Sequence, residues 1–288
     1  MIKYTSISSI QEFLVKEKRR GKTVGFVPTM GFLHEGHLTL AQQARRENDI
    51  VVMSIFVNPL QFGPNEDFES YPRNPERDAE LARSAGVDVL FLPEAAEMYS
   101  GSSIKMHVTE RTDVLCGSKR EGHFDGVVTV VSKLFNIVGP DNAYFGLKDA
   151  QQVAVIEGLV NDLNFPVNIV RVPTVREDDG LAKSSRNVYL SEVERKEAPV
   201  LNKSLKDAER LIREGEADPG RIISFIQDRI SAETSGTIDY IEIYSYPELT
   251  AIDKLQGEFI IALAVKFDKA RLIDNIIIKA AQEEIHHV

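Results

Sequence analysis

Residues 23–37 read TVGFVPTMGFLHEGH, and this stretch joins a strand to a helix through a glycine-containing turn. Its apolar beginning predicts a strand over residues 23–28, and the helical spacing of apolar residues after it predicts a helix over 38–47. His34 and His37 lie three residues apart where that helix starts, so both imidazoles share one face beside the exposed backbone N–H groups and the positive end of the helix dipole. A ligand that carries phosphate suits this arrangement.

Strand-like and helix-like segments alternate through the first part of the chain. The expected strands are 23–28, 50–57, 87–93, 143–145 and 167–172, and the expected helices are 38–47, 75–85, 127–138 and 150–163. This alternation predicts an α/β fold with a Rossmann-like parallel sheet, whose ligands bind where the strands end. Later segments read as a helix over 191–214, a second helix after Pro219, and strands at 239–244, 259–265 and 272–278. We therefore expect an α/β domain at 1–175 and a smaller α+β domain at 176–288.

The composition excludes several classes of protein. The 288 residues include 44 acidic and 34 basic side chains, which give a net charge of −10. Extended nucleic acid and anionic membrane surfaces both require a basic footprint, so neither is an expected partner, whereas small anions need only a local cluster of donors. Cys116 is the single cysteine, which excludes an intrachain disulfide. The beginning of the chain lacks the pattern of a signal peptide, and we expect a cytoplasmic protein.

Familiar nucleotide motifs are missing from the expected places. The sequence Gly21-Lys22-Thr23 resembles the end of a P-loop, but Lys16 occupies the position of the required glycine and the stretch precedes a strand. No Gly-x-Gly-x-x-Gly sequence opens a helix after the first expected strand, so a dinucleotide site has no support. His34 and His37 could be surface residues or metal ligands, but a zinc site would need a third ligand at a short spacing. The nucleotide interpretation is favoured.

Three further polar clusters follow expected strands or a domain boundary. Asn58 and Gln61 offer neutral donors and acceptors, although Asn-Pro is also a common turn. Lys148 and Gln152 are four residues apart and share one face of a helix; alternatively, Lys148 is an exposed lysine beside Asp149. Residues 183–186 bring two cations and two hydroxyls together, either as a triphosphate clamp or as a polar turn between domains.

Taken together, these motifs resemble those of the pantoate–β-alanine ligase family. The resemblance rests on residues 28–37, 56–62, 123–127, 129–131, 146–149, 183–186 and 274–275. It implies a Rossmann-like domain of the His-x-Gly-His nucleotidylyltransferase type, a C-terminal lid domain and a homodimer. It also implies a reaction in which ATP activates pantoate as an adenylate before β-alanine attacks, with magnesium bridging the ATP phosphates and no metal ligands assigned to the protein.

The resemblance also assigns residues to the substrates. His37 would be the catalytic proton donor, with His34 and Lys148 beside it on the phosphates. The implied ATP-binding set is Met30, Gly31, Phe32, Leu33, His34, Glu35, Gly36, His37, Gly146, Leu147, Lys148, Asp149, Val175, Lys183, Ser184, Ser185 and Arg186. The implied pantoate-binding set is Gln61, Gln152, Asn58, Val130 and Val131, with Gln61 also near β-alanine. The family usually has glutamate at position 147 and an apolar residue at position 183.

Three other functions fit parts of the pattern. A nucleotidylyltransferase would share the His-x-Gly-His site but keep the nucleotidyl group in its product. A small relative of the aminoacyl-tRNA synthetases is disfavoured by the net charge of −10 and by the lack of a basic anticodon-binding segment. A non-catalytic nucleotide-binding module would need none of the clusters beyond the first.

Overall fold

The computed structural model describes residues 1–63, 68–69, 71–101 and 103–280. The chain divides into two compact units, one spanning Met1–Val175 and one that begins at Arg176. Within the described residues, no helix has the length and apolar character needed to cross a membrane.

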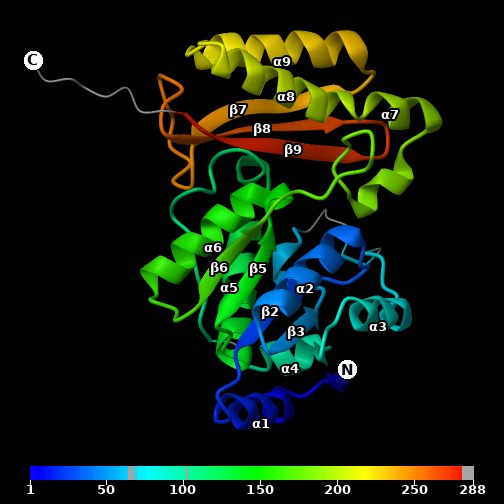
Figure 1. Cartoon of the computed structure of the whole chain (residues 1–288), viewed down its shortest axis with the longest axis vertical. Coiled ribbons are helices and arrows are strands. Elements are labelled where there is room, and N and C mark those ends of the chain that lie inside the picture. The colour runs from blue at the N-terminus through cyan, green and yellow to red at the C-terminus, as the bar shows by residue number, and fades with distance from the viewer. Residues whose placement is uncertain (64–67, 70, 102, 281–288) are drawn as a thin grey trace, which may run out of the picture. The chain divides into compact units, whose positions relative to one another are not determined.

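The first unit is built on a six-stranded parallel sheet with the strand order β1-β4-β3-β2-β5-β6 (Figure 1). Its strands are β1 (Ile2–Tyr4), β2 (Val24–Thr29), β3 (Ile50–Ile55), β4 (Val89–Phe91), β5 (Asn142–Gly146) and β6 (Asn168–Val172). Its α-helices are α1 (Ile7–Lys18), α2 (Glu35–Glu47), α3 (Pro75–Ser84), α4 (Ala95–Tyr99), α5 (His123–Val138) and α6 (Ala150–Asp162). The expected Rossmann-like parallel sheet is confirmed.

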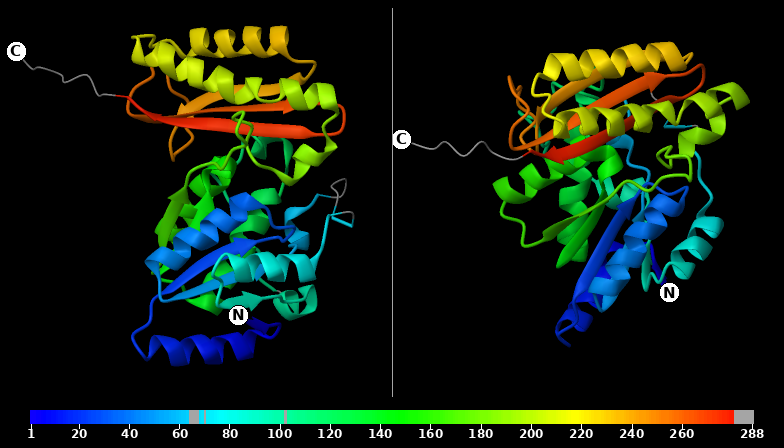
Figure 2. Two further views of the ribbon diagram at one scale, coloured as in Figure 1. Left: turned by 45° about the vertical axis from the view of Figure 1, so that its right-hand side comes forward. Right: turned by 45° about the horizontal axis from the view of Figure 1, so that its top comes forward.

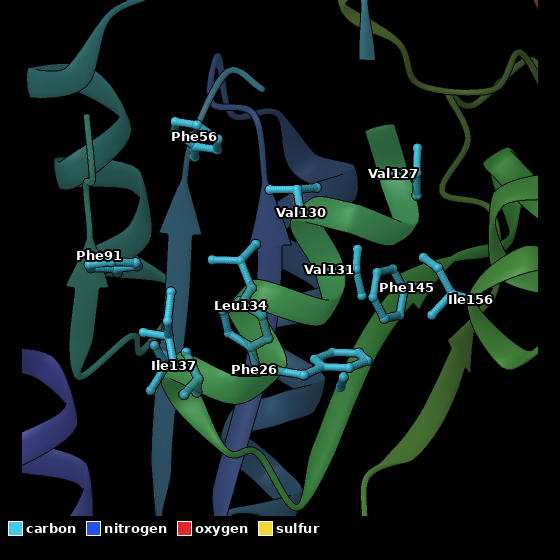
Figure 3. Close-up of a cluster of buried hydrophobic side chains, with 14 of the residues drawn as sticks. Phe26, Phe56, Phe91, Val127, Val130, Val131, Leu134, Ile137, Phe145 and Ile156 are labelled. Carbon is cyan, nitrogen blue, oxygen red and sulfur yellow. The ribbon is translucent and has the colours of Figure 1, made fainter. Parts of the chain in front are cut away.

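Two apolar layers cover the two faces of this sheet, because successive strand residues point to opposite sides. Phe26 belongs to a buried cluster that includes Val130, Val131 and Leu134 of α5, as Figure 3 shows. The next residue, Val27, belongs to a separate buried cluster with side chains of α2 and α3. Helices therefore cover both faces of the sheet. Ligands are then expected at the ends of its strands.

Two elements at the beginning of the chain were not expected. Strand β1 has only three residues and pairs in parallel with β4 at the edge of the sheet. Helix α1 buries few side chains, among them Ile10 and Leu14, so most of its surface is polar. A short edge strand and a helix with few buried apolar residues give weak periodic signals, which is why the sequence did not reveal them.

The second unit is a smaller α+β structure, as expected. Three antiparallel strands lie in the order β7 (Thr237–Ser245), β8 (Glu258–Lys266) and β9 (Arg271–Lys279). Helices α8 (Val200–Arg213) and α9 (Pro219–Glu233) run along one face of this sheet (Figure 2). The single helix expected over 191–214 is wrong, because the chain forms α7 (Glu192–Glu197) and then α8. Pro199 lies at the break, since it has no backbone N–H to continue the helix.

Candidate active site

The site lies where the order of the strands reverses. From β2 the chain moves to β3 and β4 on one side, and it returns to the other side of β2 with β5 and β6. Strands β2 and β5 pair only through Gly25 with Asn142 and Phe26 with Ala143. The loops that follow these two neighbouring strands therefore start at the topological switch point, where open α/β sheets bind their ligands.

A buried carboxylate shapes the loop after β2. Asp78 of α3 is 1% exposed, and its oxygens accept hydrogen bonds from the backbone N–H groups of Phe32 at 2.7 Å and Leu33 at 2.8 Å. Gly31 has a φ of +86°, and a Cβ there would lie 2.9 Å from Cγ2 of Ile55. Glycine is therefore required at this turn. The sequence did not point to Asp78, although a carboxylate among the apolar positions of the expected helix 75–85 was a usable signal.

Replacing Asp78 by alanine should destabilise the first unit. The change would leave two backbone N–H groups without an acceptor, each at a cost of about 1–3 kcal/mol. We expect the free energy of unfolding, measured by urea denaturation, to fall by about 3 kcal/mol. Asp78→Asn keeps one side-chain oxygen as an acceptor. Its free energy of unfolding should lie between those of the unaltered chain and Asp78→Ala. A loss below about 0.5 kcal/mol in Asp78→Ala would contradict the role of this carboxylate.

The two histidines cap the N-terminus of α2. His34 is the N-cap residue, and its Nδ1 accepts from the backbone N–H of Gly36 at 3.1 Å. In return, Nδ1 of His37 accepts from the backbone N–H of His34 at 3.3 Å, and the two ring centroids are 4.1 Å apart. An imidazole nitrogen that accepts a hydrogen bond carries no proton, so we assign the neutral Nε2–H tautomer to both rings. The pair offers two N–H donors to a ligand at the helix start.

His37 is neutral at physiological pH. Burial of its ring lowers the pKa of His37 from 6.5 to about 3, and the nearby His34 and Lys148 lower this pKa further. The folded chain therefore binds fewer protons than the unfolded chain between about pH 3 and pH 6.5, and this residue favours unfolding as the pH falls through that window. His37 is thus a hydrogen-bond donor through Nε2–H and not an imidazolium acid.

This tautomer can be observed directly in the free protein. Between pH 5 and pH 8, the ¹⁵N chemical shifts of His37 should stay those of a neutral ring protonated at Nε2, because its pKa lies well below this range. His107 has an exposed side chain and serves as the internal comparison. A titration of His37 with a midpoint near pH 6.5 would contradict the assignment.

Lys148 reaches the same site from β5. It lies in the 3₁₀ helix η3 (Leu147–Asp149), which directly follows Gly146 at the end of that strand. Its side chain is 20% exposed and its Nζ is 3.9 Å from Oδ2 of Asp149. The influence of Lys148 on the pKa of His37 shows that the two groups, 111 residues apart in the chain, share one electrostatic environment. Lys148 does lie beside Asp149, as the alternative expected, but its side chain is mostly buried.

Of the two adjacent glutamines at the start of α6, one is structural. Gln151 is buried, its Nε2 donates to the backbone oxygens of Arg111 and Val114, and its Oε1 accepts from the N–H of Gly117. Gln152 is half-buried. Gln152, the glutamine expected to bind pantoate, is therefore not the one that holds this loop in place.

Asn58 and Gln61 form a buried pair after β3. Asn58 caps the 3₁₀ helix η1 (Pro59–Gln61), and its Nδ2 donates to Oε1 of Gln61 and to the backbone oxygen of Gly126, both at 3.0 Å. A Cβ at Gly126 would lie 2.2 Å from the backbone oxygen of Leu60. Glycine at this position of α5 thus lets η1 approach the helix, a requirement that the sequence did not reveal.

Val130 and Val131 are core residues of the first unit. They are 6% and 4% exposed, and they pack in the cluster that contains Phe26 and Phe145 (Figure 3). Both lie on α5, the same helix as Gly126. Val175, from the ATP-binding set, is the last residue of the first unit.

The cluster at 183–186 lies in the second unit. Nζ of Lys183 is 3.3 Å from Oε2 of Glu177, Oγ of Ser184 accepts from the backbone N–H of Arg186, and Arg186 is exposed. The segment before it is fixed by Arg176, whose guanidinium makes two hydrogen bonds, at 2.7 and 2.9 Å, to the buried carboxylate of Asp274. The described residues contain no group of three or more His, Cys, Asp or Glu side chains that could hold a metal ion.

A family model and curated relatives place this chain in the same family. The family Pantoate-beta-alanine ligase matches residues 3–277. The pantothenate synthetase of Bacillus pumilus (strain SAFR-032) is 61% identical over 285 residues, and that of Bacillus subtilis (strain 168) is 60% identical over 285 residues; each alignment covers 99% of both chains.

Two solved structures are also similar. The pantothenate synthetase of Thermus thermophilus has a TM-score of 0.89 and 45% identity, covering 96% of this chain and 99% of that chain. The pantoate-beta-alanine ligase of Francisella tularensis, solved with beta-gamma ATP and beta-alanine, has a TM-score of 0.77 and 34% identity, covering 96% of this chain and 97% of that chain.

Proposed function

The chain belongs to the pantoate–β-alanine ligase family, and we propose from this membership that it condenses pantoate with β-alanine at the expense of ATP. It is a ligase that makes pantothenate, with AMP and pyrophosphate as the other products. The match of the family over residues 3–277 carries this conclusion. The geometry adds a set of donors at the switch point, from loops that follow two adjacent strands.

The first step activates the carboxylate of pantoate. A carboxylate oxygen attacks the α-phosphorus of ATP, the bond from this phosphorus to the bridging oxygen of pyrophosphate breaks, and pantoyl adenylate forms. Negative charge grows on the leaving pyrophosphate. The Nε2–H groups of His34 and His37 and the ammonium of Lys148 are the donors for this charge, and the hydrogen bonds at the two Nδ1 atoms fix the orientation of both imidazoles.

The second step forms the amide bond. The neutral amine of β-alanine attacks the carbonyl carbon of pantoyl adenylate, the carbon–oxygen bond to AMP breaks, and the amine loses a proton. Little covalent chemistry is required of the protein, so positioning and charge stabilisation account for the catalysis. No histidine acts as a nucleophile in this scheme.

The pantoate pocket combines polar and apolar residues. Gln61 and Gln152 bind the oxygens of pantoate, Asn58 holds Gln61, and Val130 with Val131 supplies an apolar wall for the two methyl groups. Gln61 is 7% exposed and Asn58 is fully buried, so the polar groups are held rigidly. Gln61 also lies near β-alanine in this proposal.

The remaining ATP contacts come from three segments. They are residues 30–37, residues 146–149 with Val175, and residues 183–186 of the second unit, which would act as a lid. Mg²⁺ would enter with ATP and would offset the negative charge of its phosphates, and no residue of this chain is assigned as its ligand. A homodimer and a cytoplasmic location remain predictions from the family resemblance and the sequence.

The overall reaction separates this function from its rivals. With ATP, pantoate and β-alanine present, AMP and pantothenate should appear in equal amounts, and omission of any one substrate should abolish both. A nucleotidylyltransferase would instead keep the AMP group in a stable product, and a binding module would release no AMP. Either result would contradict the proposed function.

A further inference from the structure

A chain of side-chain hydrogen bonds lies behind Gln61. The hydroxyl of Tyr99, the last residue of α4, donates to Oδ1 of Asn58 at 2.7 Å. Asn58 in turn donates from Nδ2 to Oε1 of Gln61 at 3.0 Å. Tyr99 thus reaches Gln61 through one intervening amide, although 38 residues separate them in the chain.

Backbone partners fix the direction of this chain. Oδ1 of Asn58 accepts from the backbone N–H of Leu60 at 3.2 Å, and Nδ2 donates to the backbone oxygen of Gly126 at 3.0 Å. A backbone N–H only donates and a backbone oxygen only accepts, so the amide of Asn58 has one allowed orientation. The second Nδ2 hydrogen is then donated to Oε1 of Gln61. Since Oδ1 only accepts, the hydroxyl of Tyr99 is the donor of the bond between them.

The tyrosine is suited to a role as a permanent donor. Burial raises the pKa of Tyr99, so the hydroxyl keeps its proton at physiological pH. The ring is held from two sides, with the Phe56 centroid at 6.0 Å and Nζ of Lys133 at 5.8 Å from its own centroid. A phenylalanine would fill the same space but would leave Oδ1 of Asn58 with Leu60 as its one donor.

We propose that Tyr99 is a positioning residue that acts through Asn58 to hold the amide of Gln61 with Oε1 turned inward and Nε2 turned toward the substrate. Gln61 then offers hydrogen-bond donors alone, and the pocket selects an acceptor such as a carboxylate or hydroxyl oxygen. Naming that acceptor as an oxygen of pantoate rests on the proposed function. The ammonium group of β-alanine has only donors and cannot pair with Nε2, so the contact of Gln61 with β-alanine in the proposed function would be to its carboxylate.

Tyr99→Phe tests the relay by its effect on pantoate. In pantoate-dependent exchange of pyrophosphate into ATP, the KM for pantoate should rise about tenfold, the size expected from one hydrogen bond, while the KM for ATP stays within twofold. Tyr144→Phe is the matched control, because it removes another tyrosine hydroxyl that bonds to Glu47 and Asn48. It should leave both KM values unchanged. An unchanged KM for pantoate in Tyr99→Phe would overturn the proposal.

Hydrogen exchange tests the relay without relying on the reaction. The side-chain amide hydrogens of Asn58 should exchange slowly with deuterated water in the unaltered chain and at least about tenfold faster in Tyr99→Phe, because the lost donor frees the amide to rotate. Fast exchange in the unaltered chain, or equal rates in both proteins, would overturn the relay. By contrast, slow exchange in a chain without pantoate-dependent activity would support the relay and contradict the proposed function.

Discussion

Lys148→Met is expected to lower the rate of pantoyl adenylate formation by a hundredfold or more. The substitution keeps most of the side-chain volume and removes the ammonium group whose charge acts on His37. Charge that develops on the leaving pyrophosphate would then lose a charge-assisted donor, and losses of one such donor typically cost about 10²–10³ in rate. The measurement is pantoate-dependent pyrophosphate exchange, with circular dichroism to confirm that the fold is retained.

Two further variants sharpen this prediction. Lys22→Met is the matched control, since Lys22 pairs with Glu17 and precedes β2, at the end of the strand opposite the site. Its exchange rate should stay within twofold of the unaltered chain. Lys148→Arg keeps the charge with a different geometry and should recover part of the activity. A folded Lys148→Met protein with a near-normal exchange rate would remove Lys148 from the mechanism.

His37→Ala is expected to show a loss of similar size, again about a hundredfold or more in adenylate formation. The change deletes one Nε2–H donor and also the acceptor of the backbone N–H of His34, so the orientation of the second imidazole is disturbed. Stability should suffer much less, by about 1 kcal/mol, the usual cost of a lost helix cap. Exchange assays and urea denaturation on the same preparation separate the two effects.

The control for His37 is His107→Ala. His107 also pairs with a neighbour, Asp125, but its side chain is exposed. We expect this control to keep full activity. If His37→Ala retained the exchange rate of the unaltered chain, or if an acyl- or phosphoryl-enzyme could be trapped on either histidine of the site, the mechanism would be wrong.

The sequence predicted those parts of the site that are local in the chain. His34, Gly36 and His37 lie within four residues, and the local capping of α2 is enough to bring the two imidazoles together. The alternation of strands and helices likewise predicted the parallel sheet and the edge at which the loops meet. These inferences needed no knowledge of packing.

The sequence could not predict the residues whose roles depend on tertiary contacts. Asp78 is 46 residues from Phe32, and Tyr99 is 41 residues from Asn58, so no spacing rule connects them. Pro199 could have been interpreted as a break, but the amphipathic pattern continues on both sides of it and hides the interruption. The backbone approach at Gly126 is visible only once η1 and α5 are packed together.

Pantoate-dependent exchange of labelled pyrophosphate into ATP, with β-alanine absent, tests the central claim most directly. The account predicts rapid exchange that requires pantoate, because the adenylate forms reversibly before the amine arrives. Exchange that is absent although ATP binds, or that proceeds only when β-alanine is added, would contradict the adenylate route.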